Sequence, residues 1–141
     1  MTIDVIAHGA RVLCAVSGGV DSMYLLHRMA ELGAQRGFTV GCAHFNHGLR
    51  GVESDRDEAF VRAQCEKLGV PFYAGRGDVT SVRGMGTEAA ARELRYAFLT
   101  HCADEHGYDW IATAHTADDN AETMLLNLVR GTDLRGLCGM Q

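Results

Sequence analysis

The chain has 141 residues, of which 47% are hydrophobic, and its formal net charge is −5. This length and composition fit one compact domain and exclude a disordered or fibrous chain. No apolar run reaches the ~18 residues of a membrane-spanning helix. The acidic balance argues against a protein that binds nucleic acid over its whole surface.

The first predicted elements are a strand, a glycine turn and a helix. Residues 11–16 are a short apolar run typical of a buried strand, and apolar residues recur at helical spacing over residues 23–32. Between them lies Ser17-Gly18-Gly19-Val20-Asp21-Ser22. The glycines permit a tight turn beside a ligand, and the free amides of a helix start attract anions. The turn alone is equally consistent with a capped helix, and it lacks the lysine of the other common phosphate loop.

Strand and helix patterns alternate along the rest of the chain. Strands are predicted over residues 38–45, 71–74 and 109–114. Helices are predicted over residues 53–68, 88–106 and 118–130, and Thr87 is the expected cap of the second. Residues 76–86 are rich in glycine and show no periodicity, which indicates a loop.

Strands separated by helices predict an α/β fold, with a mostly parallel sheet and helices on both faces. Ligands of such folds bind at the carboxyl ends of the strands. Polar stretches follow all four predicted strands at this edge, over residues 17–22, 44–51, 75–86 and 115–122. We therefore expect a single domain over residues 1–141, with its site at this edge of the sheet.

The cysteines and histidines do not form a recognisable metal motif. The five cysteines are far apart in the sequence and four lie in apolar runs, so we expect reduced core residues and a cytoplasmic protein. His44 and His47 are consistent with a zinc pair or with ordinary loop histidines, and two further ligands at suitable spacing are missing.

Five stretches together resemble one enzyme family. The segment Ser17–Ser22 resembles the pyrophosphate loop (PP-loop) of the N-type ATP-pyrophosphatases, which split ATP between the α and β phosphates. The other four resemble, in order, segments of the tRNA(Ile)-lysidine synthetases, with Asn120 where glutamine is usual; they are residues 46–57, 89–96, 114–123 and 128–137. The loop alone marks only the superfamily, whereas the combination is specific. The resemblance implies an adenine nucleotide alpha hydrolase-like (Rossmann-like) fold.

The resemblance also implies a reaction. ATP would adenylate oxygen 2 of the wobble cytidine in the CAU anticodon of tRNA(Ile), with release of pyrophosphate. The amine of free L-lysine would then attack carbon 2 and expel AMP, which leaves lysidine. ATP and Mg²⁺ are the expected cofactors. Two alternatives stay open: another PP-loop tRNA-modifying enzyme of the 2-thiolation type, which would need paired cysteines, and a non-catalytic adenine-nucleotide-binding module.

Site roles carried over from the family fall into three groups. ATP would contact the loop and two histidines, namely Ser17, Gly18, Gly19, Val20, Asp21, Ser22, His44 and His115. The expected catalytic residues are Asp21, which would also hold Mg²⁺, with Arg92, Asp119 and Glu122. The tRNA substrate would contact Asn46, His47, Arg50 and Arg95.

Some of these assignments have simpler readings. Asp119 and Glu122 are three residues apart, so on a helix they would share a face and bind the lysine ammonium. Acidic residues are also common in the first turn of a helix, because the helix dipole favours negative charge there, whether or not they bind a substrate. His115 is consistent with a phosphate contact or with a structural histidine.

Family members extend well beyond the length of this chain. We therefore expect residues 1–141 to be the N-terminal fragment of a longer protein, with the main tRNA-binding parts elsewhere. The fragment is expected to bind ATP and to form little or no lysidine by itself.

Overall fold

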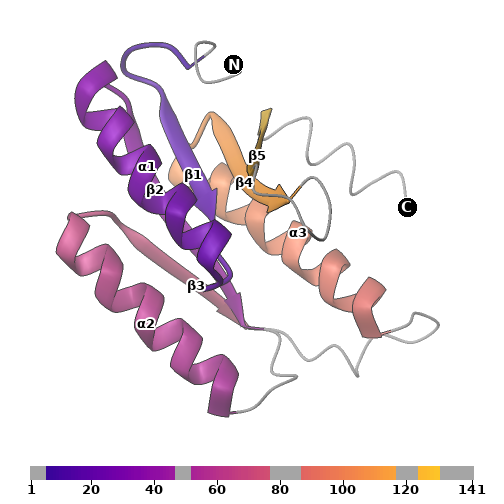
Figure 1. Cartoon of the computed structure of the whole chain (residues 1–141). Coiled ribbons are helices and arrows are strands. Elements are labelled where there is room, and N and C mark those ends of the chain that lie inside the picture. Colours follow the sequence, from indigo (N-terminus) through magenta and orange to yellow (C-terminus); the bar gives the residue numbers. More distant parts are fainter. Residues whose placement is uncertain (1–5, 47–51, 77–86, 117–123, 131–141) are drawn as a thin grey trace.

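The computed structural model describes residues 6–46, 52–76, 87–116 and 124–130, and for residues 52–54, 87–91, 115–116 and 124–130 it describes the backbone only. Strands and helices alternate along the chain until β4, which β5 follows (Figure 1). The elements are β1 (Arg11–Ala15), α1 (Val20–Arg36), β2 (Thr39–Asn46), α2 (Val52–Leu68), β3 (Phe72–Arg76), α3 (Thr87–His106), β4 (Trp110–Thr116) and β5 (Met124–Arg130).

The strands form one sheet in the order β3-β2-β1-β4-β5. Strand β1 is central and pairs in parallel with β2 on one side and β4 on the other. Strand β3 extends the parallel part beyond β2. The chain adds β2 and β3 on one side of β1 and then adds β4 on the other side, so the strand order reverses at β1. Ligands of such sheets bind at the carboxyl ends of the strands, at the point of this reversal. The predicted fold class is confirmed.

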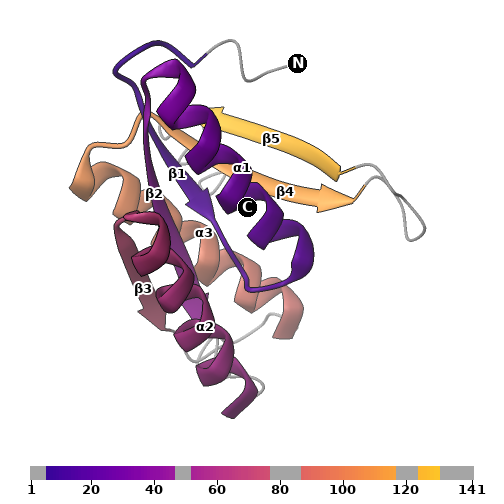
Figure 2. The same cartoon turned by 60° about the vertical axis from the view of Figure 1, so that its left-hand side comes forward.

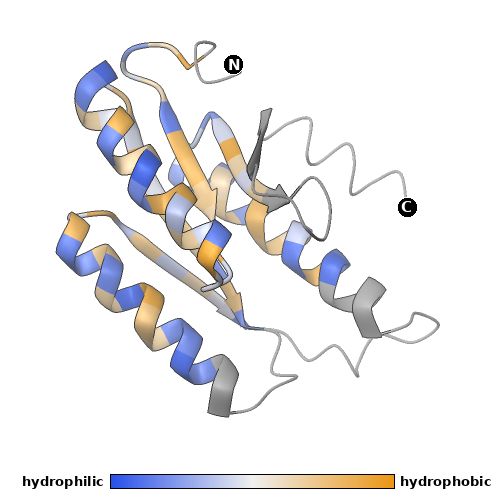
Figure 3. Ribbon diagram, viewed as in Figure 1, coloured by the Kyte–Doolittle hydropathy of each residue, from blue (hydrophilic) through white to orange (hydrophobic). Residues whose placement is uncertain are grey.

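Helices α1 and α2 cover one face of the sheet, and α3 covers the other (Figure 2). The first face carries the larger core, to which β1 contributes Val12 and Cys14, and the residue after β1 contributes Val16. The second face carries a smaller core around Leu13 and Leu99. Successive side chains of a strand point to opposite faces, so the apolar run of β1 serves both cores. The orange colour along most of the β1 ribbon in Figure 3 shows this continuous hydrophobicity.

The helix predicted over residues 118–130 is wrong for its second half. Residues 124–130 form β5, which pairs antiparallel with β4 from Trp110↔Arg130 to Thr116↔Met124. A short apolar run such as Met124–Arg130 suits either a helix or a buried strand. Pairing satisfies the edge of β4, which would otherwise present open backbone donors and acceptors. Residues 117–123 lie outside the described part.

Two element boundaries also differ from expectation. Arg76, predicted in the loop, is the last residue of β3, and Asn46, predicted just after the second strand, is the last residue of β2. Of the helices that the structure describes, none is long and apolar enough to span a membrane.

Candidate active site

The loop of residues 17–22 leaves the sheet at the carboxyl end of β1 and enters the first turn of α1 (Figure 2). Gly18 has a φ of 103°, a conformation that side-chain-bearing residues rarely adopt. A Cβ atom at Gly18 would also lie 3.3 Å from Cβ of Asp57 on α2. The loop therefore needs glycine at this position because of its backbone conformation and because of the close approach of α2.

Ser22 is the centre of the hydrogen bonds in this loop. The backbone amides of Ser17 and Gly18 both donate to Ser22 Oγ, at 3.1 and 3.2 Å. Ser22 Oγ in turn lies 3.1 Å from the carbonyl of Gly19, to which it donates, and 3.2 Å from Ser17 Oγ. Ser22 Oγ therefore accepts from two successive amides and holds the turn of the loop in place. The predicted contacts Ser17, Gly18 and Ser22 are thus brought together.

Val20 and Asp21 are the first two residues of α1, directly after the glycines of the loop. Asp21 lies half-buried in the first turn of α1, whereas Val20 beside it is 86% exposed. A carboxylate is a suitable ligand for Mg²⁺, which prefers few protein carboxylates together with phosphate oxygens. Among the described residues, no group of three or more ligating side chains is placed to hold an ion by itself. Asp21 therefore fits a magnesium ion that is held jointly with a bound phosphate chain.

His44 is buried, with 3% of its surface exposed, although it was predicted at the nucleotide. Its Nδ1 atom lies 2.8 Å from the carbonyl oxygen of Val16, the residue that precedes the loop. A carbonyl oxygen only accepts, so Nδ1 carries the hydrogen and donates it. The imidazole therefore contacts the loop through the backbone of β1.

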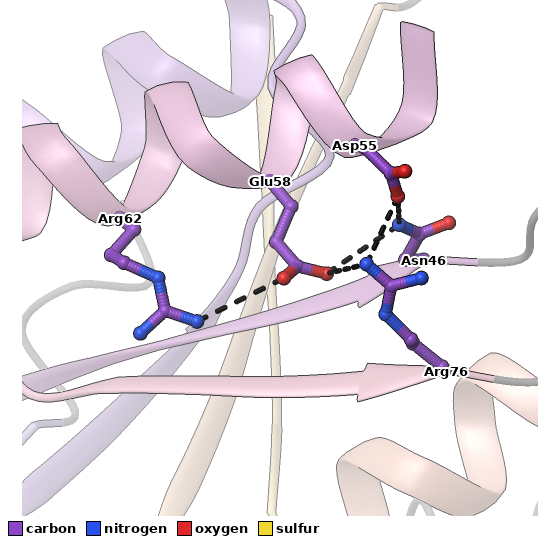
Figure 4. Close-up of polar contacts among 5 residues, drawn as sticks. All are labelled: Asn46, Asp55, Glu58, Arg62 and Arg76. Carbon is purple, nitrogen blue, oxygen red and sulfur yellow. Dashed lines mark hydrogen bonds and ion pairs between the residues drawn. The ribbon is translucent and has the colours of Figure 1, made fainter. Parts of the chain in front are cut away.

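Asn46 belongs to a polar cluster that joins β2, α2 and β3 (Figure 4). Its side-chain amide donates to Asp55 Oδ1 at 3.0 Å and to Glu58 Oε1 at 3.5 Å. Arg76 Nη2 reaches the same Asp55 oxygen at 2.9 Å. Arg62 adds a longer contact of 3.8 Å to Glu58. The predicted tRNA contact at Asn46 is thus a side chain whose amide is engaged within the domain.

Arg92 and Arg95 lie on α3, across the sheet from α1. Both are exposed, and both guanidinium groups lie against the ring of Tyr96, at 5.0 and 5.3 Å from its centroid. A guanidinium over an aromatic ring is a favourable arrangement worth about 0.5–1 kcal/mol at an exposed site. The structure therefore brings the two arginines together with each other and with Tyr96.

Other predicted site residues fall outside the described part of the chain. These are His47, Arg50, Asp119 and Glu122. The backbone of His115 pairs with that of Leu125 in the β4–β5 ladder, and its side chain is not described. The predicted helical face shared by Asp119 and Glu122 therefore remains a prediction.

Two side chains at this edge were missed by the sequence reasoning. Asp57 packs against Gly18, and Arg76 joins the Asn46 cluster. Asp57 precedes the buried Val61 by four residues, so helical periodicity places both on the face that α2 turns to the sheet. This signal was available for Asp57. For Arg76 the sequence held none beyond its place at the end of a strand.

Comparison with known proteins agrees with this arrangement. A family model described as the PP-loop domain matches residues 3–141. The chain is 49% identical over 134 residues to the tRNA(Ile)-lysidine synthase of Porphyromonas gingivalis, with 92% of this chain and 28% of that protein covered. It is 47% identical over 139 residues to the corresponding enzyme of Chlorobaculum tepidum, with 96% and 42% covered. The chain thus spans less than half the length of these relatives.

A solved structure shows the same fold. The U34-tRNA thiolase NcsA from Methanococcus maripaludis, determined with its [4Fe-4S] cluster, superposes with a TM-score of 0.70 at 22% identity. The match covers 82% of this chain and 42% of the thiolase. The family match over nearly the whole chain confirms the resemblance drawn from the motifs: the chain belongs to the PP-loop domain family.

Proposed function

We propose that this chain is the nucleotide-binding domain of a tRNA(Ile)-lysidine synthase. The observation that carries the proposal is the pair of amides, from Ser17 and Gly18, that converge on Ser22 Oγ at the sheet's ligand-binding edge. Identities of 47% and 49% to tRNA(Ile)-lysidine synthases over almost the whole chain support this choice within the family. The proposed substrates are ATP, the tRNA(Ile) with a CAU anticodon, and free L-lysine, and the proposed compartment is the cytoplasm.

In the proposed first step, oxygen 2 of the wobble cytidine attacks the α-phosphate of ATP. The bond between the α and β phosphates breaks, and pyrophosphate leaves. The backbone amides of the first turn of α1, with the hydroxyls of Ser17 and Ser22, would bind this leaving group. Fixed donors of this kind stabilise the charge that develops on it. Mg²⁺ held by Asp21 would neutralise part of that charge, and Arg92 would face the α-phosphate because a guanidinium suits phosphate oxygens.

In the proposed second step, the lysine amine attacks carbon 2 and AMP leaves. Asp119 and Glu122 would bind the ammonium group and accept the proton that must be lost before attack. His115 would contact a phosphate. Contacts to the tRNA would come from His47, Arg50 and Arg95, and from the backbone around Asn46. These roles follow the family pattern and are the part of the proposal that most needs testing.

The alternative of 2-thiolation has less support. The likeness to the thiolase is at 22% identity and concerns the fold alone. Cys14, Cys42, Cys65 and Cys102 are free, and their side chains are buried in the two cores. A cysteine buried in this way acts as a core residue rather than as a sulfur carrier.

A chimera tests the proposal directly. Residues 3–141 would replace the matching segment of the Chlorobaculum tepidum enzyme, and pyrophosphate release would be measured with and without CAU-anticodon tRNA and lysine. Release that depends on the tRNA is expected. Asp119→Ala should reduce the formation of lysidine, measured alongside, by about 100-fold or more, because Asp119 acts in the second step. The matched control is Thr39→Ala, on an exposed position of β2. A chimera that binds ATP but releases no pyrophosphate with this tRNA would contradict the proposal and favour the non-catalytic module.

A further inference from the structure

The junction between β1 and the phosphate loop is held from two sides by neighbouring residues of β2. The amide of Val16 donates to the carbonyl of Ala43 at 2.9 Å, which is the last rung of the ladder between these strands. The carbonyl of Val16 accepts from the buried imidazole of His44 at 2.8 Å. A side chain of β2 thus holds the chain at the point where the backbone ladder stops.

This contact acts on the loop through a single rigid group. The carbonyl of Val16 and the amide of Ser17 belong to the same peptide unit, which is planar and trans, so they point in opposite directions. Fixing the direction of the carbonyl therefore fixes the direction of the amide. That amide points at Ser22 Oγ, 3.1 Å away, beside the amide of Gly18 at 3.2 Å.

We propose that His44 is a positioning residue for the phosphate loop. By donating to the Val16 carbonyl, it holds the Ser17 amide on Ser22 Oγ and so fixes the shape of the loop that would receive the pyrophosphate part of ATP. This inference rests on the proposed nucleotide-binding function and names a residue that acts on the nucleotide through Val16 rather than by contact. A hydrogen bond to the carbonyl also polarises the peptide unit, which strengthens the amide as a donor by about 10–30%.

The neighbouring Gly18 explains why such a support matters here. Its φ of 103° turns the chain sharply away from the sheet, so the residues that follow Val16 receive no further rungs from β2. The Val16–Ser17 peptide is therefore the last one that β2 contacts before the loop. The His44 contact to this peptide is buried on the face covered by α1 and α2, where water would compete with it poorly.

The test compares three substitutions at His44 in the full 141-residue chain. His44→Asn keeps an N–H donor on the atom bonded to Cγ, as Nδ1 is. His44→Gln moves the donor one atom outward, and His44→Leu removes it. Binding of Mg²⁺-pyrophosphate, ATP and adenosine would be measured by calorimetry, together with the amide chemical shift of Ser17 by NMR. Thr39→Ala on the same strand is the control.

We expect His44→Leu and His44→Gln to weaken pyrophosphate and ATP binding by about tenfold, which is the loss of one well-placed hydrogen bond. His44→Asn should stay within about threefold of the unsubstituted chain. Adenosine binding should be unchanged in all three. The Ser17 amide resonance should shift in the Leu and Gln variants and remain near its original position in the Asn variant.

Three results would overturn the inference. One is equal pyrophosphate affinity in all variants. Another is a parallel loss of pyrophosphate and adenosine affinity, which would make His44 a general core residue. A third is an Asn variant as weak as the Gln variant, and this comparison holds even if His44→Leu fails to fold. An unsubstituted chain that binds neither pyrophosphate nor ATP would instead refute the proposed function on which the inference rests.

Discussion

Replacing Gly41 with alanine should destabilise the domain markedly. Gly41 lies in the middle of β2 on the face covered by α3, where it is buried against the ring of Tyr108. A Cβ atom at this position would lie 2.5 Å from Tyr108 Cζ and closer still to its hydroxyl oxygen. Tyr108 is itself buried and is held by Tyr73, whose hydroxyl is 3.1 Å away. The added methyl group therefore has no free space, and the tyrosine must move.

The expected size follows from these contacts. Overpacking a closely packed core costs about 1–3 kcal/mol. Moving Tyr108 also breaks its bond to Tyr73, and a buried hydroxyl left without a partner costs about 1–3 kcal/mol. In the opposite direction, alanine stabilises the folded domain by roughly 0.5–1 kcal/mol, because it restricts the unfolded chain more than glycine does. The free energy of unfolding should therefore fall by about 2–4 kcal/mol, a large part of the total for a domain of this size.

Urea unfolding followed by the fluorescence of Trp110, the single tryptophan, measures this change. A double-mutant cycle identifies the cause. Tyr108→Phe alone should cost about 1 kcal/mol, and added to Gly41→Ala it should recover about 1 kcal/mol of the sum, because it removes the atom nearest the new methyl group. A Gly41→Ala chain within about 0.5 kcal/mol of the unsubstituted one, or strictly additive effects in the cycle, would refute this reasoning.

Three further predictions concern the loop, the polar cluster and the core. Ser22→Ala should weaken Mg²⁺-ATP binding by about 10- to 100-fold in calorimetry. It should lower the free energy of unfolding by only about 1 kcal/mol, because the hydroxyl anchors a small, partly exposed loop. Unchanged ATP affinity would contradict the role of this residue. Arg76→Ala should change the free energy of unfolding by less than about 1 kcal/mol, because the ion-paired side chains of Arg76 and Asp55 are 62% and 57% exposed. A larger loss of stability in urea unfolding would contradict this expectation. Burial raises the pKa of the Cys14 thiol from its ordinary value of 9.0 to about 12. As the pH rises, the unfolded chain therefore loses this proton before the folded chain does. The free energy of unfolding should fall between about pH 9 and pH 12. The loss should be shallower in Cys14→Ala, and identical slopes in urea titrations of the two chains would contradict this assignment.

Local patterns were sufficient for most of the fold. The apolar run of β1, the glycines of the loop and the helical spacing after Ser22 each predict their own element, and the element order then limits the topology to a parallel sheet. The boundaries of α1, α2 and α3 also lie within a few residues of expectation because caps and periodicity act locally.

The remaining features depend on contacts between distant parts of the chain. Residues 124–130 carry an apolar run that fits two kinds of element, and the open edge of β4 favours the strand. The approach of Asp57 to Gly18 depends on how α2 packs against α1 and β2, which no one of these segments encodes alone. Likewise, the imidazole of His44 is directed at Val16, 28 positions earlier, and a motif that names the histidine does not identify its partner.

The two sides of β2 together fix how this strand can slide along its neighbours. On one side His44 and Asn46 face α1 and α2, and on the other Gly41 makes room for Tyr108 below α3. A displacement by one residue would exchange the two sets, so that a bulky side chain would meet the tyrosine and the donors for the loop would face the wrong layer. A sheet with β2 shifted by one residue is thus destabilised on both faces. The side chains of β2 that complete the site therefore also favour the correct alignment of this strand.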